Sequence, residues 1–287
     1  MQWLVFSILN AFFESVSNAF GKRGALKINV LSAAWAQRFF SLFIILPLVF
    51  FTNSFQQVNY TFWIAVFATS SLNTITSLLF VKAIKDSPLS LTLPIVALTP
   101  IFLLITSPII VGEFPKLLGV LGIITTVIGS YILNLSKRVH SPIEPLLSIV
   151  KEEGPRLMLI VAFIWSITSN IDKIAVKNSN PILFSFASTC MILFFLTIIL
   201  LFKKTSFKDI FRGSMILAPI GFSSGLSYVF QMTAISMTIV PNVITVKRTS
   251  ALFGIVWGKV FFKEKNIKER LIGTIIMILG VVLIAIS

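Results

Sequence analysis

This chain of 287 residues contains few charged side chains, one cysteine and one histidine. Charged residues make up 12% of it, against about 25% in soluble domains, whereas hydrophobic residues make up 56%. The single cysteine, Cys190, lies in an apolar run, so an intramolecular disulfide is excluded and a buried, inert thiol is expected. The amino-terminal end has no basic segment and no small-residue cleavage site, so residues 3–20 are predicted to form a first membrane span rather than a removable signal.

Catalytic motifs are also missing. The sequence has no HExxH zinc motif, no Asp-Asp pair and no GxxxxGK[ST] phosphate-binding loop. His140, the only histidine, falls in a predicted loop and is expected to be solvated. These absences argue against an intramembrane enzyme and against direct ATP drive, and no cofactor or metal is expected.

The hydrophobic content predicts an all-α integral membrane protein with ten transmembrane helices. Each span needs about 20 apolar residues, and the predicted spans are 3–20, 29–51, 61–81, 88–111, 117–135, 157–175, 181–202, 214–235, 240–262 and 271–286. The net charge of +14 comes mainly from Lys and Arg at span ends, which predicts topology rather than a nucleic-acid partner. Because these residues concentrate in odd-numbered loops, the odd loops are predicted to be cytoplasmic and both termini outside, in the inner or plasma membrane.

The chain repeats itself at a constant offset of 151 residues. Matching positions include Ala83-Ile84 with Ala234-Ile235, Glu113 with Glu264, Gly122 with Gly273, and Gly129 with Gly280. We therefore predict a five-helix repeat over 1–136, a cytoplasmic linker with a short surface helix over 137–156, and a second repeat over 157–287. An odd number of spans inverts the second repeat, and inverted repeats are typical of secondary transporters.

Proline distinguishes the two repeats. Pro88, Pro94, Pro100 and Pro108 interrupt the fourth span, whereas the ninth span has only Pro241 at its start. Proline removes a helix hydrogen bond, so the fourth span is predicted to be kinked and the ninth to be more rigid. The kinked helix is either a gating element or a static packing feature.

Four charged residues fall in the middle third of the predicted membrane: Glu14, Arg38, Lys247 and Arg248. A charge there costs at least about 2.5 kcal/mol on insertion scales, which makes each a functional candidate. Lys247 and Arg248 are predicted to bind an anion, with structural pairing as the alternative. Glu14 is interpreted as a proton carrier, a site for a cationic substrate, or an ion-pair partner of Arg38.

Polar residues lie at matching positions of the third and eighth spans. Asn73 and Ser77 share one helix face, and Ser224, Tyr228 and Gln231 lie on the corresponding span of the second half. Cavity lining is the preferred interpretation and helix packing the alternative.

The repeated acidic pair has a different interpretation. Glu113 and Glu264 end spans four and nine, and both are followed by glycines that permit close helix approach. This symmetry predicts an architectural role rather than contact with substrate.

The chain resembles the EamA-type members of the drug/metabolite transporter superfamily. The resemblance is carried by Ala-Phe-Ile-Trp-Ser at 162–166 with Lys173, by Phe-Lys-Glu-Lys at 262–265 with Gly273 and Gly280, and by Ala-Phe-Phe-Glu-Ser at 11–15 with Lys22, Glu113, Gly122 and Gly129. It implies two five-helix repeats and transport of metabolites. Lys247-Arg248 is similar to a Lys-Arg pair of plastid phosphate translocators, although span four here has no Lys. Glu14 is similar in placement to the first-helix Glu of small multidrug transporters, although Trp165 holds the matching position of the second half.

The sequence thus predicts a secondary active transporter, a monomer or homodimer, for a small organic anion or zwitterion such as an amino-acid-like metabolite. Lys247 and Arg248 are predicted to hold this substrate, with hydrogen bonds from Asn73, Tyr228 and Gln231. The alternative is a proton-coupled exporter of lipophilic cations that is centred on Glu14.

Overall fold

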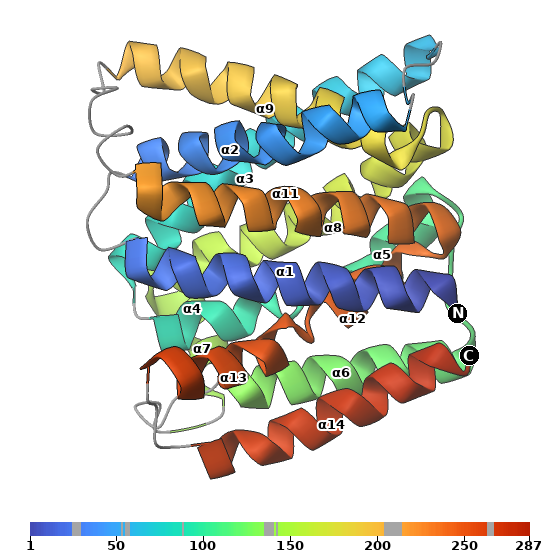
Figure 1. Ribbon diagram of the computed structural model, residues 1–287. Coiled ribbons are helices and arrows are strands. Elements are labelled where there is room, and N and C mark those ends of the chain that lie inside the picture. The colour runs from blue at the N-terminus through green and yellow to red at the C-terminus, as the bar shows by residue number, and fades with distance from the viewer. Residues whose placement is uncertain are drawn as a thin grey trace. The chain divides into compact units, whose positions relative to one another are not determined.

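A computed structural model of the chain describes residues 1–24, 30–52, 54, 58–87, 89–134, 141, 143–203, 214–262 and 267–287. All regular elements in these ranges are helices, which confirms the predicted all-α class (Figure 1). They are α1 (Gln2–Gly24), α2 (Val30–Phe51), α3 (Tyr60–Asp86), α4 (Leu89–Val96), α5 (Thr99–Ile110), α6 (Leu117–Asn134), α7 (Glu144–Lys151), α8 (Glu153–Lys177), α9 (Pro181–Phe202), α11 (Ser214–Met237), α12 (Val240–Lys247), α13 (Ser250–Phe262) and α14 (Ile267–Ala285).

Five segments of the described chain are long and apolar enough to cross a membrane. They are Leu31–Phe51, Tyr60–Phe80, Leu91–Ile110, Glu153–Lys177 and Pro181–Phe202. Leu117–Leu133 and Ile272–Ala285 are shorter apolar helices. The full set of ten spans stays a prediction.

The helix boundaries follow the sequence repeat. Helix α9 has the boundaries of α2 displaced by 151 residues, and α12 has those of α4 displaced by the same amount. The offset found in scattered sequence matches is therefore also a property of the secondary structure.

Both the fourth and the ninth predicted spans are interrupted, and they are interrupted at equivalent positions. In the first half, the Leu98 N–H donates to the Ile95 carbonyl at 3.0 Å, three residues back. In the second half, the Thr249 N–H donates to the Val246 carbonyl at 2.9 Å. These tight turns separate α4 from α5 and α12 from α13, since an α-helix would use the carbonyl four residues back.

The prediction of a more rigid ninth span was therefore wrong. Pro100 removes a backbone donor next to the first break, but the second break needs no proline. There the Thr249 hydroxyl donates to the Val246 carbonyl at 2.7 Å.

The helices form two compact units, each of which draws segments from both halves of the chain. Unit 1 comprises Ile75–Asn170 and Thr238–Ser287, with Met1, and unit 2 comprises Gln2–Thr74 and Ile171–Met237. The boundaries fall inside α3 and α8, so these two helices contribute to both units. The predicted division at 137–156 concerns the sequence repeats and stays a prediction.

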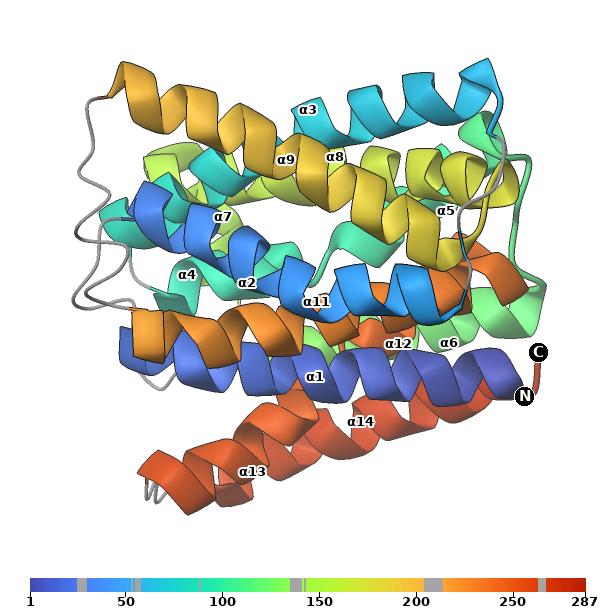
Figure 2. The same ribbon diagram turned by 45° about the horizontal axis from the view of Figure 1, so that its top comes forward.

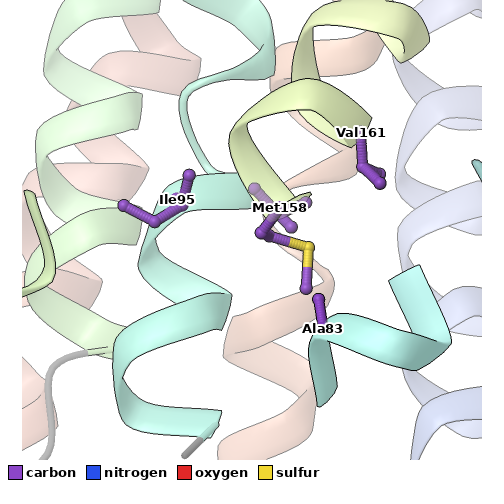
Figure 3. Packing of buried hydrophobic residues seen from close by; sticks show 5 residues of the cluster. Ala83, Ile95, Met158 and Val161 are labelled. Atoms are coloured by element: carbon purple, nitrogen blue, oxygen red, sulfur yellow. The ribbon is translucent and has the colours of Figure 1, made fainter. Parts of the chain in front are cut away.

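A buried apolar cluster in unit 1 joins α3, α4 and α8. Figure 3 shows the Met158 side chain of α8 reaching toward Ala83 of α3, with Ile95 of α4 nearby. Ile149 of α7 packs against the same cluster, and α7 confirms the short helix predicted in the linker. Helix α8 begins at Glu153 rather than 157, because Pro155 is tolerated in a first helical turn.

Glycines bring α6 and α14 into close contact in unit 1, where the two helices run side by side (Figure 1). A Cβ atom added at Gly129 would lie 2.5 Å from the Met277 amide nitrogen and 2.8 Å from the Gly273 carbonyl oxygen. One added at Gly122 would lie 2.7 Å from the Gly280 carbonyl oxygen. This packing confirms the predicted role of the repeated glycines.

In unit 2, α11 packs against α1, α2 and α9 (Figure 2). A Cβ atom added at Gly225 of α11 would lie 2.9 Å from the Ser41 carbonyl oxygen of α2. Ile45 and Val49 of α2 meet Val229 of α11 in a buried cluster. These contacts fix the helix faces that present the polar residues of unit 2.

Candidate functional site

Unit 2 contains a group of polar and charged side chains from five helices, here called the unit 2 polar cluster. Its members are Glu14 of α1, Arg38 of α2, Thr69 and Asn73 of α3, Asp172 of α8, and Ser227 and Tyr228 of α11. Charged groups inside a membrane are costly and mark functional sites by default.

Asp172 is the most deeply buried carboxylate of the cluster, with 4% of its surface exposed. Its Oδ1 atom accepts a hydrogen bond from the Thr69 hydroxyl at 2.5 Å. The Thr69 oxygen in turn accepts a hydrogen bond from the Asn73 amide at 3.1 Å. This chain connects Asn73, a predicted site residue, to a carboxylate that the sequence analysis missed.

Arg38 is the cation of the cluster. Its Cζ atom lies 5.9 Å from the centroid of the Tyr228 ring, within the range of a cation–π contact. Glu14 and Asp172 lie near enough for their charges to act on the guanidinium group. The Tyr228 hydroxyl shares a hydrogen bond of 3.0 Å with the Ser188 hydroxyl of α9, which fixes the ring.

Glu14 is held by a hydroxyl from α11. The Ser227 Oγ atom lies 3.1 Å from Glu14 Oε2 and 2.8 Å from Asn10 Oδ1, so its one proton is shared between these acceptors. The structure thus places the predicted Glu14 and Arg38 in one electrostatic network, together with Asp172.

The second half has a contact equivalent to Glu14–Ser227. At an offset of 151, Glu14 corresponds to Trp165 and Ser227 to Thr76. The Trp165 indole N–H donates to the Thr76 hydroxyl at 3.1 Å, within unit 1. In both units, therefore, the first helix of one half bonds to the third helix of the other, and only in unit 2 does this contact carry a charge.

Two other polar residues of unit 2 connect helices. The Ser224 hydroxyl accepts a hydrogen bond from the Gln37 amide at 2.6 Å and shares one of 2.7 Å with Ser17. These contacts join α11 to α1 and α2, which favours the helix-packing alternative for Ser224. Gln231 is buried on the same helix. The Lys173 ammonium donates to the Ile235 carbonyl at 2.6 Å, close to the carboxyl-terminal end of α11.

Lys247 and Arg248 lie in unit 1, at the break between α12 and α13. Lys247 is the last residue of α12, and both side chains are half-buried. At this point the negative end of the α12 dipole meets the positive end of the α13 dipole. Ser77, on the α3 segment of unit 1, is half-buried as well. The predicted site residues are thus divided between the two units.

Of the repeated glutamates and the single histidine, the structure describes only Glu113. Glu113 Oε2 accepts a hydrogen bond from the Val240 N–H at 3.1 Å and so caps the first residue of α12. This contact confirms the architectural role predicted for Glu113. Glu264 and His140 lie outside the described residues.

A third polar group joins α5 to α8 in unit 1. The Ser107 hydroxyl donates to Asn170 Oδ1 at 2.7 Å, and the Asn170 amide donates to the Thr106 hydroxyl at 3.1 Å. These groups satisfy one another, which is typical of helix packing. Among the described residues, no group of three His, Cys, Asp or Glu side chains is placed to hold a metal ion.

Comparison with known proteins identifies the family. The profile of the EamA-like transporter family matches residues 1–135 and 154–286. A solved structure described only as "Crystal structure of protein" aligns with a TM-score of 0.78 and 11% identity, over 99% of this chain and 97% of the other. This likeness shows the fold alone. No curated protein shows significant similarity to the chain.

The two matched segments cover most of the sequence and correspond to the two halves of the repeat. The family consists of membrane transporters of small molecules and not of enzymes, so the chain is a multi-pass membrane protein. It belongs to the EamA-like transporter family.

Proposed function

We propose that this protein is a secondary active transporter that moves a small organic anion or zwitterion, such as an amino-acid-like metabolite, by alternating access. In this proposal the protein lies in the inner or plasma membrane. It has ten spans, arranged as two inverted five-helix repeats, which carry out the transport. The observation that carries the proposal is the pair of helix breaks at equivalent positions of the two halves. Discontinuous helices in corresponding positions are the strongest local indicator of a transporter binding site.

At both breaks the backbone leaves the regular helix ladder and forms tighter turns. Backbone that leaves the helix ladder inside a membrane is tolerated only where it is covered by protein or lines a water-filled cavity. Half-helix amino-terminal ends favour anionic groups. The α12–α13 break therefore suits the negatively charged part of a substrate.

Lys247 and Arg248 make the α12–α13 break selective for anions. A guanidinium group binds a carboxylate or phosphate through two parallel hydrogen bonds, and an ammonium group adds a point charge. The equivalent residues of the first half are Val96 and Ala97, so the two cations belong to one break only. Within unit 2, Asn73, Tyr228 and Gln231 remain the candidate hydrogen-bonding residues.

A thermal-shift screen of the purified protein tests this proposal. We expect anions or amino acids to raise the melting temperature of the wild-type protein, and the Lys247→Gln/Arg248→Gln variant to lose this response. Lys116→Gln is the matched control, because it removes an exposed cation outside the break. A response that survives in the double variant would refute the assignment of these two residues.

The second candidate is a proton-coupled exporter of lipophilic cations centred on Glu14. It is favoured by the composition of the unit 2 polar cluster, which holds two carboxylates, Glu14 and Asp172, and one guanidinium group, that of Arg38. Under this function Glu14→Gln would abolish resistance of cells to cationic drugs, and Lys247→Gln/Arg248→Gln would leave it intact. The opposite pattern would favour the anion or zwitterion transporter.

A further inference from the structure

Helix α7 carries a row of exposed apolar side chains. Ile143, Leu146, Leu147 and Val150 are 57%, 41%, 56% and 81% exposed. Their spacing of three, four and seven residues places them on one face of the helix. We call these four residues the α7 stripe. Large apolar side chains so strongly exposed along one helix face require a partner surface.

The opposite face of α7 is already occupied. Pro145 and Ser148 are buried, and Ile149 packs against the cluster of Ala83, Ile95 and Met158. At about 100° per residue, the buried positions lie on the far side of the helix from the α7 stripe. The helix is therefore held by one face, and the α7 stripe points away from unit 1.

The position of α7 in the chain places it at a membrane boundary. Helix α7 ends at Lys151, and the candidate span α8 begins at Glu153. Only Glu152, with an extended backbone, lies between them. A connection this short keeps α7 within a few residues' reach of the level at which α8 enters the membrane.

The charged residues of α7 fit a helix that lies in the plane of the membrane surface. Glu144 and Lys151 are seven residues apart and therefore share one flank, about 90° from the centre of the α7 stripe. A helix with an apolar face and a charged flank binds at the membrane interface, with its apolar side chains about 5–10 Å deep between headgroups and acyl chains.

We propose that α7 is an interfacial helix whose α7 stripe inserts into the headgroup–acyl boundary of the same bilayer that the chain spans. The chain belongs to a membrane transporter family and only one residue separates α7 from α8, so the insertion of the α7 stripe does not depend on the proposed substrate. The four side chains of the α7 stripe, three in the eight-residue helix and Ile143 at its N-cap, are far fewer than the roughly 20–30 residues per side of a stable protein interface. Lipid is therefore a better occupant than a second copy of the chain.

Helix α7 also contacts α4, the helix that precedes the first break. Ile149 contacts the cluster that contains Ile95, which lies two residues before the α4–α5 break. A helix held at a set depth by lipid thus holds the α4 half-helix at a set depth as well.

Fluorescence quenching by lipids tests the proposal. In a Cys190→Ser background, Leu147→Cys and Val150→Cys are labelled separately with a small fluorophore, and the full-length protein is placed in phosphatidylcholine nanodiscs. The lipids carry a quencher either near the headgroup or near the end of the acyl chain. Lys151→Cys on the charged flank is the matched control, and Phe67→Cys, exposed near the middle of the Tyr60–Phe80 span, is the depth reference.

We expect probes at positions 147 and 150 to be quenched more by the headgroup-level quencher than by the deep one, and the probe at 67 to show the reverse. The probe at 151 is expected to be quenched little by either lipid. The proposal is overturned if positions 147 and 150 are quenched no more than position 151. It is also overturned if these two positions form disulfide-linked dimers in high yield while lipid quenchers have no effect, since a second copy would then cover the α7 stripe.

Discussion

The glycine contact between α6 and α14 predicts a sharp difference between two glycine-to-alanine substitutions. A methyl group at Gly129 would lie 2.5 Å from the Met277 amide nitrogen and 2.8 Å from the Gly273 carbonyl oxygen. Both partners are backbone atoms, so the helices must separate by about 0.9 Å to reach the 3.4 Å at which ordinary van der Waals contact begins. Overpacking of this kind costs about 1–3 kcal/mol of the free energy of unfolding.

Gly254 provides the matched control, because it lies inside α13 and no heavy atom lies within 4 Å of an added methyl group. There alanine should stabilise the helix, by up to about 1 kcal/mol from helix propensity. Melting temperatures in detergent, read by fluorescence-detected size exclusion, should therefore fall for Gly129→Ala and stay level or rise for Gly254→Ala. Equal shifts for the two variants would refute the close packing of α6 on α14.

Three further substitutions test individual contacts. Thr69→Val removes the hydroxyl that donates to Asp172, and we expect thermal denaturation to show a loss of about 1–3 kcal/mol, because a buried carboxylate loses a donor. Trp165→Phe keeps an aromatic ring but removes the hydrogen bond to Thr76, which should cost about 1 kcal/mol in the same assay. Glu153→Gln breaks an exposed ion pair with Lys82 and should leave the melting temperature unchanged, because such pairs contribute little.

Features that depend on composition and periodicity could be predicted from the sequence. Apolar runs indicated helices, and the offset of 151 residues reappears in the boundaries of α2 and α9. The glycines at 122, 129, 273 and 280 were correctly assigned to close helix packing. Glu113 was correctly assigned an architectural role, since it caps α12.

The second helix break was not predicted from the sequence, because no proline lies at it. The Thr249 hydroxyl donates to the Val246 carbonyl at this break, but the Ser166 hydroxyl makes the same type of contact with the Phe163 carbonyl inside the continuous helix α8. Such a contact does not by itself predict a break. The matching break after α4 was anticipated as a kink because prolines mark it. Positions 246–249 are equivalent to positions 95–98 at the offset of 151 residues. A comparison of the two segments would have raised the question of whether the ninth span is broken as well.

Asp172 was missed for a different reason. It lies three residues from the end of the predicted sixth span and is followed by Lys173, so the two residues have the pattern of a solvated helix end. The structure instead buries both, and their partners, Thr69 and the Ile235 carbonyl, are distant in sequence. The burial of these two charges depends on the packing of α8 against α3 and α11 in unit 2, which the sequence of α8 alone does not reveal.

Counterflow in proteoliposomes tests the central claim most directly. Vesicles that contain the protein and a high internal concentration of an anionic or zwitterionic metabolite, chosen by the thermal-shift screen, are diluted into a trace of the same labelled compound without ATP. The account predicts transient accumulation of the label by the wild-type protein and by Lys116→Gln, and none by Lys247→Gln/Arg248→Gln. Accumulation by the double variant, or no counterflow of any compound that stabilises the wild-type protein, would contradict it.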